Sequence, residues 1–157
     1  MSRVGLIRVG LISDTHGLLR PQALAALQGS DHIIHAGDIG SAEILQALGR
    51  IAPLSVVRGN NDRDAWAEDV PEIANVSFGA VRVHVLHDLH DLAIAALRGV
   101  AVVVSGHSHK PHIERRDSVL YVNPGSAGPR RFKLPVTVGG LSIDGTSVQA
   151  RIFELPA

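Results

Sequence analysis

The sequence contains no cysteine among its 157 residues, so it offers neither disulfide bonds nor thiolate ligands for a metal. Aromatic residues make up only 3%, so Val, Ile, Leu and Ala must fill the core. Basic and acidic residues balance at 15 each, which leaves no net field to attract polynucleotides or anionic membranes. No stretch approaches the ~18 uninterrupted apolar residues of a membrane-spanning helix. We therefore expect a soluble, cytoplasmic protein with no membrane partner, and the charge gives no support for a nucleic-acid partner.

The length predicts a single domain over residues 1–157, because the chain is too short for two domains with cores of their own. The first 13 residues carry arginines but no small-residue cleavage site, so we expect a strand there rather than a signal peptide. Helical patterns occur at 20–28, 41–48 and 91–97, the last with Asp91 as its expected N-cap.

Six apolar, β-branched runs predict strands, and they lie at 9–13, 32–36, 54–58, 81–86, 101–105 and 119–122. Alternation of strands and helices in the first half predicts parallel crossovers. After His109 the pattern changes to strands at 112–116, 118–122, 136–143 and 147–153, with a hairpin signal at Asp144-Gly145. This half should be antiparallel. The predicted fold class is α/β, with two packed mixed β-sheets flanked by helices.

A short polar cluster follows each of the six predicted strands. The clusters are Asp14-Thr15-His16, Gly37-Asp38, Gly59-Asn60-Asn61-Asp62, His87-Asp88, Gly106-His107-Ser108-His109 and Asn123-Pro124-Gly125-Ser126. Because an open sheet gathers its strand ends along one edge, residues scattered from 14 to 126 can converge there on one ligand.

The cluster side chains are carboxylates, imidazoles and amides without sulfur, a set that suits Mn²⁺, Fe²⁺, Zn²⁺ or Ni²⁺. Asp14 and His16 are two residues apart, as are His107 and His109, so in an extended chain each pair projects from one side. Two ions about 3.5–4 Å apart need a shared ligand, and a carboxylate can bridge them. Asp38 is the candidate for that role.

These motifs, in this order, resemble the calcineurin-like metallophosphoesterases, specifically their small bacterial and archaeal phosphodiesterase branch. The motifs are the D-x-H of Asp14 and His16, the G-D of Asp38, the G-N of Asn60, the lone His87, the G-H-x-H of His107 and His109, and the trailing N-P-G-S. The resemblance covers essentially the whole chain. It implies a four-layer α/β/β/α sandwich, the metallophosphoesterase fold.

The resemblance also implies two metal-ligand sets. One metal would take Asp14, His16, Asp38 and His109, and the other would take Asp38, Asn60, His87 and His107. Mn²⁺ is the expected metal, with Ni²⁺, Fe²⁺ and Zn²⁺ as alternatives. A water or hydroxide between the metals would attack phosphorus in line, with Asp38, Asn60, His87 and His107 as the catalytic residues.

The chain departs from the family pattern at two positions. Larger members have a histidine after the G-N motif that is thought to assist the leaving group, whereas this chain has Asn61 and then Asp62. We expect Asp62 to brace the loop or to orient a ligand. Small members usually have glycine after the histidine at position 87, whereas this chain has Asp88, which would narrow the pocket or repel an anionic substrate.

Other polar residues are assigned ordinary roles. Core or surface positions are expected for five histidines outside the metal scheme, namely His32, His35, His84, His90 and His112. Of these, His90 lies near enough in sequence to His87 to reach the substrate side. Asn123 to Ser126 should form a turn that buttresses the site, and Arg130, Arg131 and Lys133 a solvated loop.

The leading hypothesis is thus a two-metal phosphodiesterase acting on a small phosphoester. Alternatives are a phosphomonoesterase or nucleotidase, and a non-catalytic interaction scaffold on the same fold, as in a retromer subunit. A nuclease draws support only from a few arginines and one lysine. Apolar edge strands also leave room for a homo-oligomer.

Overall fold

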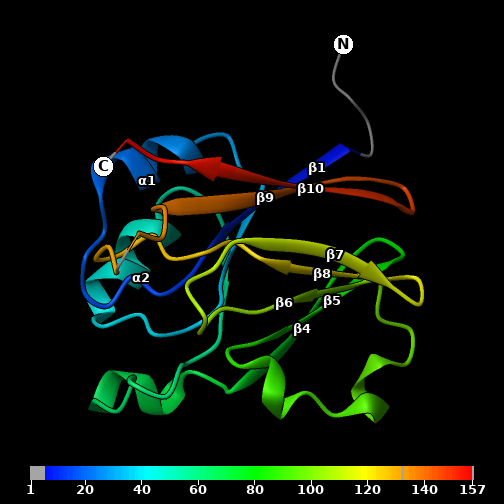
Figure 1. Ribbon diagram of the computed structural model, residues 1–157, viewed down its shortest axis with the longest axis horizontal. Coiled ribbons are helices and arrows are strands. Elements are labelled where there is room, and N and C mark those ends of the chain that lie inside the picture. The colour runs from blue at the N-terminus through cyan, green and yellow to red at the C-terminus, as the bar shows by residue number, and fades with distance from the viewer. Residues whose placement is uncertain (1–5, 132, 157) are drawn as a thin grey trace.

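Two five-stranded sheets pack face to face in the computed structural model, which describes residues 6–131 and 133–156 (Figure 1). Sheet A has the strand order β10-β9-β1-β2-β3, and sheet B has the order β4-β5-β6-β8-β7. Both sheets contain parallel and antiparallel pairs. The predicted fold class, two packed mixed sheets flanked by helices, is confirmed.

Sheet A is formed by strands from both ends of the chain. Its strands are β1 (Leu6–Ile12), β2 (His32–His35), β3 (Leu54–Val56), β9 (Thr137–Asp144) and β10 (Ser147–Glu154). The first three are parallel, and α1 (Pro21–Leu27) and α2 (Ala42–Gly49) connect them, as predicted. Pro21 begins α1, where its missing N–H costs no hydrogen bond. The predicted hairpin joins β9 to β10, with Gly145 in the left-handed region.

Sheet B is formed by the middle of the chain. Its strands are β4 (Ile73–Phe78), β5 (Val81–Leu86), β6 (Val102–Val104), β7 (His112–Arg116) and β8 (Val119–Asn123). Strand β4 had no counterpart in the sequence prediction. The expectation of an antiparallel second half is only partly right, because β8 pairs parallel to β6 while β9 and β10 cross to sheet A. In sheet B the parallel pairs β5-β6 and β6-β8 lie at the centre, and the antiparallel pairs β4-β5 and β7-β8 lie at the edges.

The predicted third helix over 91–97 is wrong. The segment instead contains two short 3-10 helices, η2 (Leu89–Asp91) and η3 (Ile94–Leu97), and another, η1 (Ala65–Asp69), lies between β3 and β4. Asp88 rather than Asp91 caps η2, accepting a hydrogen bond from the His90 N–H. The residues between η2 and η3 are extended, and this lets Leu89, Leu92 and Leu97 all pack on sheet B.

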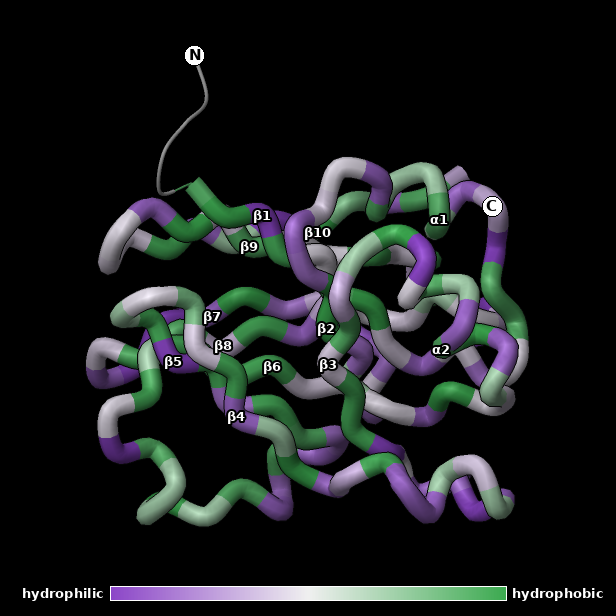
Figure 2. Tube along the Cα trace, turned by 180° about the vertical axis from the view of Figure 1, so that it is seen from behind, coloured by the Kyte–Doolittle hydropathy of each residue, from purple (hydrophilic) through white to green (hydrophobic). Residues whose placement is uncertain are grey.

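Three apolar clusters hold the layers together, and Figure 2 shows hydrophobic stretches along β1, β6 and β8. The largest lies between the sheets and is mostly valine, for example Val83, Val102 and Val104, each 0% exposed. A second lies under α1 and α2, and a third under η2 and η3. Within the described part of the chain, no helix has the length and hydropathy to cross a membrane. The packing fixes the strand ends from which the site is built.

Candidate metal centre

Five of the six polar clusters meet at one edge of the sandwich, and they come from both sheets. The loops after β1, β2 and β3 carry Asp14 and His16, Asp38, and Asn60. The loops after β5 and β6 carry His87, and His107 with His109. The prediction assumed a single sheet edge, whereas two facing edges supply these residues. Two sheets allow ligands to approach a centre from opposite sides.

Five of the predicted ligands have left-handed backbone conformations, although none is glycine. Their φ angles are 55° for Asp14, 47° for His16, 55° for Asp38, 72° for His107 and 64° for His109. The expectation that the pairs project from extended chain is therefore wrong. Such conformations cost free energy in non-glycine residues and concentrate at functional sites. The strain is offset by the surrounding hydrogen bonds.

The first candidate ligand group comprises Asp14, His16 and His109, which each offer an atom within 4.8 Å of the others. Asp14 Oδ1 lies 3.5 Å from His109 Nε2 and 3.8 Å from His16 Nε2. The two ring nitrogens lie 3.3 Å apart. Asp14 and His109 are buried, and His16 is half-buried. Three potential metal-ligand atoms thus face a common point close to the protein interior.

The second candidate ligand group comprises Asp38, His87 and His107, by the same 4.8 Å criterion. Asp38 Oδ2 lies 3.1 Å from His87 Nε2 and also 3.7 Å from His16 Nε2 of the first group. The Asp38 carboxylate therefore lies between the groups, as a shared ligand would. His107 is the exposed member, at 44%. The division into two groups follows the predicted ligand sets.

Two buried polar atoms at this centre, Asp14 Oδ1 and His109 Nδ1, have no hydrogen-bond partner among the described residues. A buried polar atom without a partner costs about 1–3 kcal/mol. The His87 ring is oriented by its Nδ1–H, which donates to the Ala36 carbonyl over 2.8 Å. This points Nε2 at Asp38 Oδ2, 3.1 Å away, and makes it the ring atom available to a metal, the arrangement typical of a metal-binding histidine. The donor set therefore fits divalent transition-metal ions.

Electrostatics differ between the groups. Burial raises the pKa of Asp14 above 3.8, and burial together with the nearby charge of Arg131 lowers the pKa of His109 to about 4. Burial alone would lower the pKa of His87, but its hydrogen bond to Asp38 and the charge of Asp14 raise it to about 8. Burial alone would raise the pKa of the Asp38 carboxyl, but His87 and the Asn61 N–H lower this pKa to about 2. Without metal, His87 and Asp38 form an ion pair.

Asp62 braces the Asp38 loop, as predicted. Its carboxylate is 4% exposed and accepts hydrogen bonds from the N–H groups of Ile39, Gly40 and Gly59 at 2.9–3.1 Å. Gly59 itself packs against Asp38 so closely that a Cβ there would overlap the carboxylate. The loops after β2 and β3 are thereby locked together, which fixes the position of the Asp38 side chain.

The residues after Gly59 have divided roles. Asn60 is exposed and lines the same cavity as His87 and His107. Asn61 turns the other way, with its backbone N–H donating to Asp38 Oδ1 over 3.0 Å and its side-chain amide to Oδ2 over 3.3 Å. Sequence reasoning missed this contact of Asn61, although the repeated asparagine was a signal for it.

The Asn123 cluster supports the site without entering it, as predicted. The Asn123 amide donates to the Gly106 carbonyl and to the Ser108 hydroxyl, so it holds the loop that carries His107 and His109. The Ser126 hydroxyl donates to the Asp14 carbonyl over 3.0 Å. Two further hydrogen bonds, from the Ser13 hydroxyl and the His107 N–H to Asp14 Oδ2, fix that carboxylate. No feature of the sequence pattern pointed to the role of Ser13.

The remaining histidines lie outside the centre, as predicted. His35 is fully buried, with Nδ1 accepting from the Gly37 N–H and Nε2 3.0 Å from the Thr15 hydroxyl, and burial lowers its pKa to about 3. His84, His32 and His112 pair with local side chains. His90 lies at the surface, as expected of a histidine outside the metal scheme, with its ring 93% exposed and paired with Asp88. Asp88 itself also lies 3.6 Å from His107.

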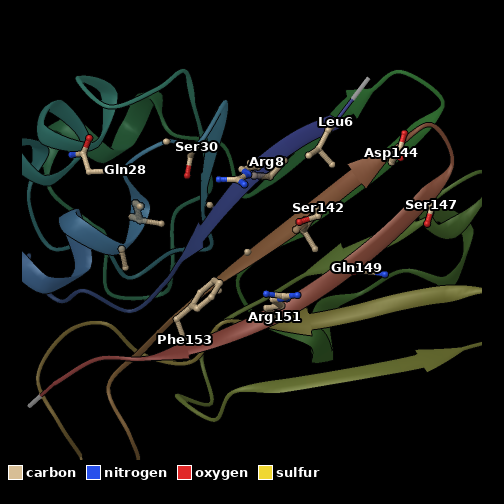
Figure 3. A pocket seen from close by; sticks show the side chains of 18 residues that line it. Leu6, Arg8, Gln28, Ser30, Ser142, Asp144, Ser147, Gln149, Arg151 and Phe153 are labelled. Atoms are coloured by element: carbon tan, nitrogen blue, oxygen red, sulfur yellow. The ribbon is translucent and has the colours of Figure 1, made fainter. Parts of the chain in front are cut away.

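Two cavities mark the described surface. One, of about 810 Å³, extends outward from the second ligand group and includes Asn60, His87, Asp88 and His107. The other, of about 520 Å³, lies on the outer face of β1, β9 and β10 (Figure 3). Its labelled side chains, such as Arg8, Ser142, Arg151 and Phe153, include no predicted ligand. Only the first cavity joins the candidate metal centre.

Comparison with known proteins agrees with this geometry. Residues 7–146 match the model of the calcineurin-like phosphoesterase superfamily domain. A probable metallophosphoesterase of Methanothermobacter thermautotrophicus is 34% identical, with 95% of this chain and 93% of that protein aligned. Among solved structures, a novel archaeal phosphodiesterase has a TM-score of 0.76 at 24% identity, covering 94% of this chain and 100% of that one. Vacuolar protein sorting 29 from Cryptosporidium parvum has a TM-score of 0.81 at 20% identity, with coverages of 96% and 92%. The chain belongs to the calcineurin-like phosphoesterase superfamily.

Proposed function

We propose that this protein is a phosphodiesterase that depends on two divalent metal ions, with Mn²⁺ as the metal in the cell. The observation that carries the proposal is the position of Asp38. Its Oδ2 lies 3.1 Å from His87 Nε2 and 3.7 Å from His16 Nε2, so one carboxylate faces both ligand groups. Asp14, His16 and His109 would hold one ion, His87, His107 and Asn60 the other, and Asp38 both.

Bound divalent ions supply two things here, namely a lowered pKa for a bound water and compensation of the charge on the phosphoryl oxygens. The chain provides orientation. Asn60 lines the cavity beside His87 and His107, and its amide N–H is the group that would hold a phosphoryl oxygen in line for attack. The buried Asp14 carboxylate is held by Ser13 and the His107 N–H, so its free oxygen keeps a fixed direction.

Neither residue that follows Asn60 is available as a general acid. Asn61 donates to Asp38, and the Asp62 carboxylate accepts three backbone N–H groups in a buried position. Departure of the leaving alkoxide therefore lacks a neighbouring proton donor on this loop. We expect the rate to depend steeply on the pKa of the leaving group, with aryl diesters hydrolysed faster than alkyl diesters.

The test is hydrolysis of ethyl p-nitrophenyl phosphate by Mn²⁺-reconstituted protein, with p-nitrophenyl phosphate as the monoester comparison. We expect a higher kcat/KM for the diester, and loss of activity in folded Asp38→Ala and His107→Ala. Diester activity that survives both substitutions overturns the proposal. Faster monoester than diester turnover would instead favour the phosphomonoesterase or nucleotidase alternative.

A second candidate function is a non-catalytic interaction scaffold. The fold similarity to vacuolar protein sorting 29, with a TM-score of 0.81, is the observation that favours it. The two readings differ in metal content. A phosphodiesterase should retain about two Mn²⁺ ions per chain after reconstitution and dialysis. Fewer than about one ion per chain, together with no hydrolysis of any phosphoester, would favour the scaffold.

A further inference from the structure

The cavity that joins the metal centre has an uneven distribution of charge. Its charged lining residues are Arg58, Asp62, Arg63, Glu68, Glu72, Asp88 and Asp91. Three of these are committed elsewhere. Arg58 and Glu72 neutralise each other over 3.1 Å, and the Asp62 carboxylate is buried among backbone N–H groups. The charges left to face a ligand are one arginine, Arg63, and three acids.

The three acids line the mouth of the cavity rather than its inner end. Glu68 and Asp91 are exposed, and their carboxylates form no hydrogen bond or ion pair with any other described residue. Asp88 is 28% exposed and lies between His90 and His107. Exposed Ile73 and buried Leu86 add apolar surface beside them. A ligand that extends outward from the centre therefore meets net negative charge and some hydrocarbon.

The inner end of the cavity, at His87, is suited to an anion rather than to a cation. His87 is 6% exposed there, and its Nε2 lies 3.1 Å from Asp38 Oδ2, the carboxylate that both candidate ligand groups share. Under the proposed function, this end holds metal and receives the anionic phosphoryl group. The cavity therefore combines a buried end suited to an anion with three acidic side chains that are more exposed than His87.

We propose that the substrate is a phosphodiester whose second ester arm carries a cationic ammonium group, and that Glu68, Asp88 and Asp91 select this arm. The inference rests on the proposed phosphodiesterase function and names its substrate class. A zwitterionic diester places its phosphate at the inner end and its ammonium group beside the three acids. A polynucleotide or a nucleotide with further phosphates would instead bring anionic groups to the same wall.

The expected size of the selection follows from Coulomb's law. A unit charge about 8 Å away contributes roughly a twofold factor in a water-like dielectric at low ionic strength. Three acids less one arginine leave two net negative charges, so a cationic arm should be preferred by about fivefold over a neutral arm of the same shape. Salt at about 0.5 M should remove most of this preference.

The experiment compares two substrates that differ in one atom of the arm. These are p-nitrophenyl phosphorylcholine and its 3,3-dimethylbutyl counterpart, in which carbon replaces the ammonium nitrogen. We measure kcat/KM for both on Mn²⁺-loaded protein at low and high salt. A readout independent of turnover is the calorimetric Kd of choline methylphosphonate against 3,3-dimethylbutyl methylphosphonate, since both have poor leaving groups.

The variants are Asp91→Asn, Glu68→Gln and the double substitution, because neither residue touches a candidate metal ligand. Asp88 is left intact because it lies 3.6 Å from His107. Each single variant should lower the choline preference about twofold, and the double variant should bring it close to one. The matched control is Glu43→Gln, which removes an exposed carboxylate from α2, away from the cavity, and should leave the preference unchanged.

A salt-sensitive choline preference in both readouts that the double variant abolishes would support the inference. Equal kcat/KM and equal Kd for the two arms would overturn it while leaving the phosphodiesterase proposal standing, as would a preference that the double variant retains. Absence of Mn²⁺-dependent hydrolysis of both substrates and of ethyl p-nitrophenyl phosphate would overturn the proposed function, and the inference with it.

Discussion

The two candidate ligand groups are similar in composition but differ in their state without metal. The Asp14 group is buried, and its His109 has a pKa lowered to about 4, so that ring is neutral at pH 7. In the Asp38 group, His87 has a pKa of about 8 beside a carboxylate with a pKa of about 2, so the pair is ionised. In the Asp14 group, the carboxylate oxygen Asp14 Oδ1 has no hydrogen-bond partner among the described residues. In the Asp38 group, the protonated His87 ring directs its Nε2 proton at the Asp38 carboxylate. Metal at the second group must displace that proton, which predicts different pH dependence for the two sites.

The largest expected effect comes from the residue that both groups share. Asp38→Ala should lower diester hydrolysis by about 10³-fold or more, because it removes a ligand from both ions at once. Bound Mn²⁺ should fall below one ion per chain by elemental analysis. The control Asp144→Asn, in the hairpin between β9 and β10, should retain two ions and full activity. Two ions bound to the Asp38→Ala protein would show that the groups do not share this carboxylate.

The second largest effect should come from Asp62, the residue that braces the loop carrying Asp38. Asp62→Asn should lower the free energy of unfolding by about 2–3 kcal/mol, since an amide cannot accept from three backbone N–H groups as the carboxylate does. Urea unfolding of the metal-free protein measures this loss. A change of under about 0.5 kcal/mol would mean that the hydrogen bonds of Asp62 do not brace the Asp38 loop.

The pH dependence tests the difference in protonation directly. Folding raises the pKa of His87 from 6.5 to about 8, so its ion pair stabilises the metal-free protein below pH 6.5, and this stability is lost as the pH rises through 8. Mn²⁺ competes with that proton. Affinity at the Asp38 group should therefore rise about tenfold per pH unit between pH 6 and 7.5. Calorimetry in buffers of different ionisation enthalpy should detect about one proton released at this site at pH 7, and release of no proton would contradict the assignment.

A smaller pair of effects should act on one group each. Ser13→Ala removes the hydroxyl that donates to Asp14, and Asn61→Ala removes the amide that donates to Asp38. Supporting residues of this kind change metal affinity by about tenfold. Stepwise Mn²⁺ titration should show Ser13→Ala weakening one binding step and Asn61→Ala weakening the other. Equal weakening of both steps by each variant would argue against two distinguishable groups.

Much of the site could be predicted from the sequence because the strands that precede it are strongly marked. Valine-rich runs identify β5 and β6, and polar residues at their ends stand out against them. Strand β4 was harder to find, although its partly buried Ala74 and Val76 alternate with exposed residues, because Ala and Asn favour other structures. The prediction of a third helix over 91–97 was wrong, because Leu89, Leu92 and Leu97 pack on the sheet only if the chain is extended between them.

The inward geometry of the ligands could not be predicted. The left-handed conformations of Asp14, Asp38 and His107 run against local preference, and hydrogen bonds from distant segments maintain them. The Asp14 N–H donates to the Gly37 carbonyl on the neighbouring loop of sheet A over 3.0 Å, and the His107 N–H donates from a loop of sheet B to Asp14 Oδ2 over 3.1 Å. Such contacts depend on how strands and sheets pack, which local sequence does not encode. The sequence thus indicates which residues do chemistry, and the fold determines how they face each other.

Titration of metal-free protein with Mn²⁺, followed by ethyl p-nitrophenyl phosphate hydrolysis, shows whether diester hydrolysis needs two ions joined through Asp38. We expect activity to remain low through the first equivalent, to rise with the second and to be constant beyond two ions per chain. Full activity at one equivalent, or hydrolysis without metal, would show that the pair of ions is not required.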